Sequence, residues 1–175
     1  MTTTGPAGGE FLDRPGLEGA FGALMDEYAR AAADFCRVVE AFAPPEFAAE
    51  RPSKDPNTVS PRAVCLHAYG AARRYSDYIR KARGLPHDDR FLPDPAAIDG
   101  PGSVRGRIAE ALRYTEGALE GLHGANEARL ASLRFPVRWG PTYDPEMILE
   151  HGIVHLLRHR RQLERWKPGP VAEGG

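Results

Sequence analysis

Three of the six histidines lie near the C-terminus and are spaced four residues apart, at His151, His155 and His159. Four residues are about one turn of α-helix, so side chains at positions i and i+4 lie one above the other on the same face. Two imidazoles held in this way can ligate one metal ion, as they do in helical His-x-x-x-His sites. The spacing therefore predicts divalent metal binding, for which another part of the chain must supply a third ligand.

A helical wheel of this last segment separates the three candidates. At roughly 100° per residue, His159 lies on the apolar side of the helix, and His155 lies about 40° nearer the charged side. His151 lies about 40° further out, beside Arg158. We therefore predict His155 and His159 as metal ligands and keep His151 as the alternative ligand. Gln162 lies close below them and is a candidate to orient a ligand histidine by hydrogen bonding.

The third ligand that we predict is His67, which lies in an earlier helical segment. Its neighbours are small, at Ala68, Gly70, Ala71 and Ala72, and leave room for a metal ion with open coordination positions. A three-histidine site with open positions is typical of catalytic metal sites, whereas closed four-ligand sites are structural. The alternative is a metal-free protein in which these histidines are polar residues at the edge of the core.

Other candidate ligands receive weaker support. His87 and His123 lie in polar surroundings and are predicted to be exposed to solvent, and Asp88-Asp89 beside His87 is a weak alternative metal patch. The two cysteines, Cys36 and Cys65, lie within helical patterns and are predicted to be small buried apolar residues.

Composition narrows the class of protein. The chain has 175 residues, a net charge of −1, 42% apolar residues and 27% charged residues, which fits one globular domain. Near-neutral charge gives no reason to expect nucleic acid or a membrane surface as a partner. No apolar run reaches 18 residues, the N-terminus does not resemble a signal peptide, and two cysteines do not suggest a disulfide framework. We therefore expect a cytoplasmic protein.

The elements that must position the histidines are four amphipathic helices. Apolar periodicity and capping signals predict them at residues 17–42, 61–83, 104–133 and 144–166. Without a predicted sheet, four such helices indicate an all-α fold and a four-helix bundle. The connections 43–59 and 85–102 are long for a bundle and are predicted to form functional rims. Residues 1–14 and 168–175 are predicted to be flexible ends of one domain, 15–167.

The order and spacing of these motifs resemble the DinB-like family, including its YfiT group. The segment Val64-Cys-Leu-His67 is similar to the family's first metal histidine. The last helix carries His155-Leu-Leu-Arg-His159-Arg-Arg-Gln162-Leu163, where the family commonly has His-x-x-x-His-Arg-Gly-Gln. The resemblance covers roughly residues 17–166, and Arg161 departs from it by replacing the glycine.

This resemblance implies a bundle with up-down-down-up topology and a divalent metal ion, nickel or zinc, held by His67, His155 and His159. It also implies a homodimer. Relatives include metal-dependent hydrolases and thiol S-transferases that use a low-molecular-weight thiol such as bacillithiol or mycothiol, so we expect a small-molecule substrate. No Asp or Glu is obviously placed as a general base. The alternative is therefore a non-catalytic stress-response protein that holds a metal or a small ligand.

Overall fold

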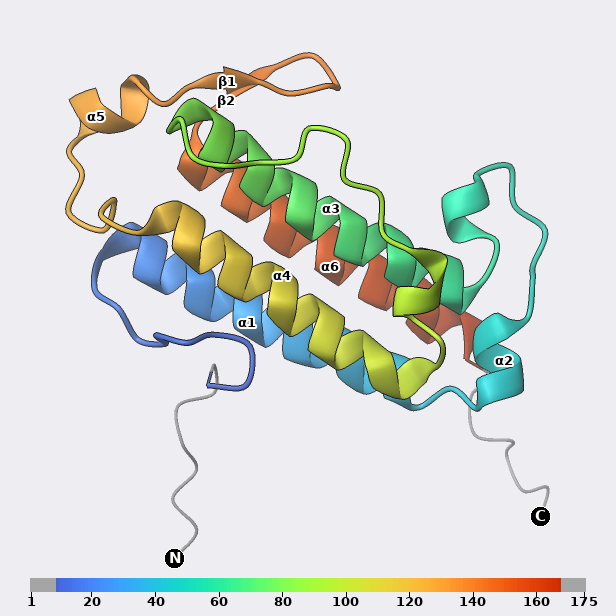
Figure 1. Ribbon diagram of the computed structural model, residues 1–175. Helices are drawn as coiled ribbons and strands as arrows, with labels where there is room; N and C mark the ends of the chain where they lie inside the picture. Colours follow the sequence, from blue (N-terminus) through green and yellow to red (C-terminus); the bar gives the residue numbers. More distant parts are fainter. Residues whose placement is uncertain (1–8, 168–175) are drawn as a thin grey trace, which may run out of the picture.

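Four long helices dominate the computed structural model, which describes residues 9–167 (Figure 1). Each long helix contacts two of the others: α1 packs against α4 and α6, and α3 packs against the same two helices. The direction of α1 and α6 is opposite to that of α3 and α4 (Figure 1). The all-α fold predicted from the sequence is confirmed. The long helices are α1 (Gly19–Glu40), α3 (Pro61–Ala82), α4 (Val104–Leu119) and α6 (Pro145–Trp166).

Shorter elements occupy the connections between the long helices. The connection between α1 and α3 contains a short helix and a 3-10 turn, and the connection between α3 and α4 contains two further 3-10 turns. A short helix and a small hairpin lie between α4 and α6 (Figure 1). In chain order these elements are α2 (Pro44–Ala48), η1 (Pro56–Thr58), η2 (Pro95–Ala97), η3 (Pro101–Ser103), α5 (Glu127–Ala131), β1 (Phe135–Pro136) and β2 (Thr142–Tyr143).

Capping side chains start the two helices that carry the candidate ligands. The Ser60 hydroxyl accepts a hydrogen bond from the backbone N–H of Ala63 at 3.1 Å, at the start of α3. The Asp144 carboxylate accepts one from the N–H of Met147 at 3.0 Å, at the start of α6. Each cap is followed by a proline, which suits the first helical position because its missing N–H would have no partner there. Both starts were predicted from the sequence.

The region after α4 differs from the prediction. The apolar pattern predicts one helix over residues 104–133, but α4 ends at Leu119 and the short α5 follows. Gly121 has a φ of +77°, a left-handed conformation that favours glycine and interrupts a helix. The prediction of no sheet also fails in detail, because β1 and β2 pair antiparallel over two residues each.

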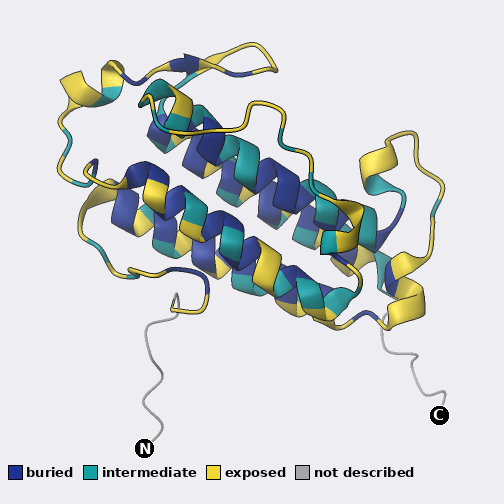
Figure 2. Ribbon diagram, in the orientation of Figure 1, coloured by how far each residue is buried: buried dark blue, intermediate teal, exposed yellow. Residues whose placement is uncertain are grey.

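The buried residues form one core between the four long helices (Figure 2). Phe11 and Leu12 belong to this core, and the N–H groups of Asp13 and Arg14 donate to the carboxylate of Glu116 on α4. Packing therefore begins before residue 15, and the prediction of a flexible segment through residue 14 is wrong for residues 9–14. Residues 1–8 and the predicted tail 168–175 lie outside the described residues.

Within residues 9–167, none of the helices combines the length and the apolar character needed to cross a bilayer.

Candidate metal centre

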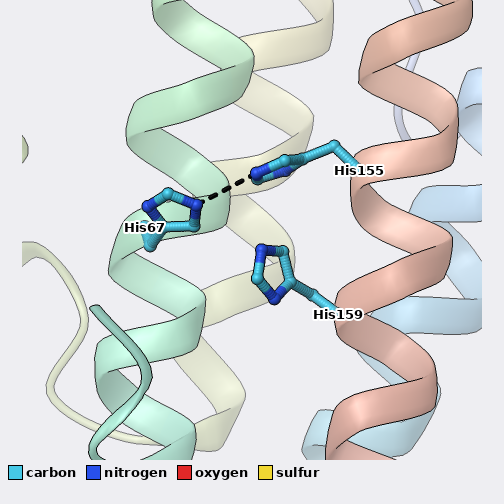
Figure 3. Close-up of side chains that lie close together, drawn as sticks. All are labelled: His67, His155 and His159. Carbon is cyan, nitrogen blue, oxygen red and sulfur yellow. Dashed lines mark hydrogen bonds between the residues drawn. The ribbon is translucent and has the colours of Figure 1, made fainter. Parts of the chain in front are cut away.

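His67, His155 and His159 converge in the space between α3 and α6 (Figure 3). His67 comes from α3, and the other two come from successive turns of α6. Nε2 of His67 lies 3.0 Å from Nε2 of His155. One nitrogen from each ring can be chosen so that all three lie within 4.8 Å of one another. The structure thus brings together the three residues that the sequence selected as ligands.

The spacing of the rings suits one shared ion. Two nitrogens bound to one tetrahedral zinc at about 2.0–2.1 Å lie roughly 3.3 Å apart. The Nε2 atoms of His67 and His155 are already close to this separation. The ring centroid of His159 lies 5.1 Å from that of His67 and 4.5 Å from that of His155. Small side-chain rotations would therefore bring three imidazoles onto one ion.

Gln162 determines which nitrogen of His159 faces the cluster. Its side-chain Oε1 lies 2.9 Å from Nδ1 of His159. Because Oε1 is an acceptor, Nδ1 carries the proton and Nε2 keeps its lone pair. This Nε2 is buried and has no hydrogen-bond partner among the described residues. A buried acceptor without a partner is unfavourable, and a divalent cation would satisfy it, so the residues present fit a metal ion.

Burial keeps these imidazoles neutral. Burial, with a further contribution from the charge of His159, lowers the pKa of His67 to about 4. The pKa of His155 is lowered well below its usual range, mainly by burial and also by His159 and His67. Burial also lowers the pKa of His159, although its hydrogen bond to Gln162 opposes the shift. All three rings are therefore in the neutral form that ligates metals near pH 7.

A cleft of about 600 Å³ opens beside the cluster. This volume lies within the range of small-molecule sites, which is roughly 300–1,000 Å³. Side chains of α6 form one wall, and residues of η1 and its cap form another. The residues that line it are Asp55, Thr58, His67, Arg158, His159, Arg161, Gln162, Arg165 and Trp166.

Comparisons with protein-family models, with curated proteins and with solved structures find no match. The function must therefore be inferred from the chemistry of the site itself. Three neutral imidazoles at the edge of an open cleft can hold a divalent ion and leave coordination positions free for a small molecule.

Asp55 is a cleft residue that was not predicted from the sequence. Its carboxylate caps η1 and accepts hydrogen bonds from the backbone N–H and the side-chain amide of Asn57, at 2.9 and 2.8 Å. The backbone hydrogen bond from Asn57 lowers the pKa of Asp55, and the charges of His67 and His159 lower it further. The sequence does contain a signal for Asp55, because Asp55-Pro56 repeats the capping pattern of Asp144-Pro145. This repeat lies within a connection that is predicted to form a functional rim.

His151, the alternative ligand, lies outside the three-histidine cluster. Its ring stacks on that of Trp139, with centroids 4.7 Å apart, and meets Tyr75 edge-on at 5.2 Å. Trp139 follows β1 in the hairpin and also lines a small cavity of about 30 Å³ behind His67. His151 therefore joins α6 to the hairpin by aromatic packing.

The remaining candidates lie away from the cluster. His87 is exposed, as predicted, and Asp89 beside it pairs with Lys81 at 2.7 Å. The prediction that His123 is exposed is wrong, because the chain after α4 turns back onto the start of α1. There His123 is half-buried and meets Phe21 edge-on at 6.4 Å. Both cysteines are free and buried, as the sequence predicted: Cys36 and Cys65.

Proposed function

We propose that the chain binds one divalent metal ion through His67, His155 and His159 and acts on a small molecule in the adjoining cleft. One observation carries this proposal: the buried Nε2 of His159 has no hydrogen-bond partner within residues 9–167 and belongs to a group of three imidazoles on two helices. Neutral imidazole is a good ligand for zinc and nickel, so these are the metals that the proposal names.

The proposed reaction is hydrolysis or the transfer of a thiol. A bound ion would lower the pKa of a water or thiol and polarise a substrate. The chain itself supplies the orientation, because Gln162 fixes the ring of His159 with Nε2 toward the cluster. Asp55 lies in the same cleft, and in this proposal its carboxylate accepts the proton that the nucleophile gives up.

The proposal includes membership of the DinB-like family. A DinB-like four-helix bundle with up-down-down-up topology is supported by the order and opposed directions of the four long helices (Figure 1). The placement of His67 and of the His155–Gln162 motif at one site supports it as well. A cytoplasmic location, which the free cysteines favour, and a homodimer complete the proposal.

A second candidate is a protein that holds the metal or a small ligand without catalysis. Oδ1 of Asp55 already accepts two hydrogen bonds from Asn57, and its pKa is lowered. A carboxylate that is stabilised in its ionised form is a weak base, and this observation favours binding over proton transfer.

Metal analysis of tag-free protein tests the binding step. Wild type purified without chelators and incubated with zinc or nickel should retain about one ion per chain after desalting. Variants with alanine at His67, His155 or His159 should retain much less. His87→Ala is the matched control, since His87 is exposed and lies outside the cluster. Equal metal content in wild type and His159→Ala would rule the proposal out.

Activity of the loaded protein separates the two candidates. Metal-loaded wild type should hydrolyse an ester or amide, or transfer a thiol to an electrophile, and Asp55→Asn should lose most of this activity while keeping its metal. A metal-loaded wild type that is inactive in both kinds of assay supports the non-catalytic candidate.

A further inference from the structure

We infer that the cleft beside the three histidines takes a small molecule that carries a phosphate or carboxylate group, and that Arg158, Arg161 and Arg165 bind this anionic group. The inference rests on the proposed function, because it names the class of substrate for the same site. Its basis is separate from the histidines, since it depends on arginine side chains of α6 that lie outside the three-histidine group.

The three arginines form one stripe along α6. They are spaced three and four residues apart, so their side chains lie on the same face of the helix. All three are exposed and line the cleft together with His159 and Gln162. Like charges at this spacing repel one another and destabilise a helix. An anion bound between them would remove this repulsion.

These three guanidinium groups have no ion pair or hydrogen bond within residues 9–167. Arg160, on the same helix, shows the contrast: it pairs with Asp34 at 3.1 Å and with Glu164 at 3.3 Å. The arginines of the cleft are thus free to bind a ligand. A guanidinium presents a planar fork of donors that matches a carboxylate or a phosphate bidentately.

The positive charge of the cleft is local. The whole chain has a net charge of −1, so an excess of positive charge is not a general property of the chain. Among the residues lining the cleft, Asp55 is the one that opposes three arginines, and Asn57 already occupies one of its oxygens. A concave site lined mainly by one sign of charge concentrates ions of the opposite sign.

The shape of the cleft indicates a small molecule. Its volume of about 600 Å³ is that of a metabolite site. Trp166 adds an aromatic side chain at the same end of α6 as Arg165, and His67 and His159 line the same cleft. A substrate held at the arginines by its anionic group would place a second, reactive group beside the histidines.

Binding of three simple probes tests this inference by calorimetry at constant ionic strength. The probes are inorganic phosphate, succinate and the neutral analogue succinamide, added to zinc-loaded and to metal-free protein. One variant replaces Arg158, Arg161 and Arg165 with glutamine. The control replaces Arg90, Arg129 and Arg134 with glutamine, which changes the net charge equally at exposed positions outside the cleft.

Wild type should bind phosphate, succinate or both, and it should bind succinamide at least ten-fold more weakly. Both results should be the same for zinc-loaded and for metal-free protein. The cleft variant should bind the anions at least ten-fold more weakly than wild type, with its zinc content unchanged, and the control variant should match wild type. The relative affinity for phosphate and succinate identifies the anionic group.

Three results would overturn the inference: no anion binding by wild type, equal binding by the cleft variant, or binding of succinamide as tight as that of succinate. Zinc content is measured on the same samples. A wild type that retains zinc but binds neither anion counts against this inference alone, whereas arginine-dependent anion binding by a wild type that does not retain zinc counts against the proposed function alone.

Discussion

Oε1 of Gln162 accepts a hydrogen bond from Nδ1–H of His159 at 2.9 Å, and this contact leaves the buried Nε2 as the nitrogen available to a metal ion. The two residues are three positions apart on α6, so one helical turn carries both the candidate ligand and the group that orients it. Such hydrogen bonds fix the tautomer and ring angle of metal-binding histidines. The proposed metal site would therefore depend on a residue that need not touch the ion.

Replacing Gln162 with leucine should weaken zinc affinity roughly 10- to 100-fold, the usual effect of losing such a partner. Gln162→Glu keeps an acceptor for Nδ1–H and should retain affinity near that of wild type. Competition with a chromophoric chelator measures both. Glu150→Gln, an exposed change on the same helix, serves as the control. Unchanged affinity in Gln162→Leu would show that the hydrogen bond does not orient the ligand.

Metal should raise the melting temperature of wild type. An ion at about 100 times its Kd stabilises a folded protein by about 2.7 kcal/mol if only the folded state binds it. For a domain of this size that corresponds to roughly 5–10 °C. His159→Ala should still fold, because the core is formed by the four long helices, but it should lose this rise. His87→Ala should keep the metal-dependent rise in melting temperature. Calorimetry with and without a chelator measures this rise for each protein.

The metal-free protein should lose stability as the pH falls from about 6.5 toward 4. Burial lowers the pKa of His67 to about 4 in the folded state, whereas an unfolded histidine titrates near 6.5. Between these values the unfolded chain binds more protons, so acidification favours unfolding. Above pH 6.5 both states are neutral at this position and the effect disappears. Urea unfolding of chelator-treated protein at several pH values measures this dependence.

His67→Gln removes this titrating group and should unfold with a shallower dependence on pH over the same interval. Identical slopes for wild type and the variant would mean that His67 is not held in its neutral form by the folded structure.

Gly152→Ala should destabilise the protein by about 1–3 kcal/mol, because a Cβ at this position of α6 would overpack the interface with α1. It would lie 2.6 Å from the hydroxyl oxygen of Tyr28 and 2.8 Å from its Cζ. Zinc affinity should fall as well, since α6 carries two of the three histidines. Chemical denaturation and zinc titration measure the two effects.

The matched control is Gly106→Ala on α4, where a Cβ meets nothing within 4 Å. That change should stabilise by about 0.5–1 kcal/mol, as alanine does in exposed helices. Combining Gly152→Ala with Tyr28→Phe removes the nearest clashing atom and should recover part of the loss. A Gly152→Ala variant as stable as wild type would mean that α1 and α6 can separate without cost.

Periodicity and caps were sufficient to predict the long helices, and the helical wheel placed His155 and His159 on the buried side of α6. Both are buried and His151 is half-buried, because the angle around a helix largely decides exposure. The wheel could not show that His67 would face them, since that depends on how α3 packs against α6.

The predictions from the sequence failed in the connections between the long helices. The apolar pattern continues to Leu122, but Gly121 turns the chain after Leu119 and ends α4. His123 is half-buried because the chain then returns to Phe21, a contact between distant positions. Asp55 was missed because a loop has no periodicity from which its direction can be inferred.

The chain contains two tryptophans, and each lines a separate cavity that His67 also lines. Trp166 lines the open cleft with His67 and His159, while Trp139 lines the small cavity behind His67. Indole emission is therefore an intrinsic optical signal from this site. Trp139→Phe leaves Trp166 to report events in the cleft, and Trp166→Phe leaves Trp139 to report movement of the hairpin. Occupation of the cleft and displacement of the hairpin can thus be followed separately in real time, without an attached dye.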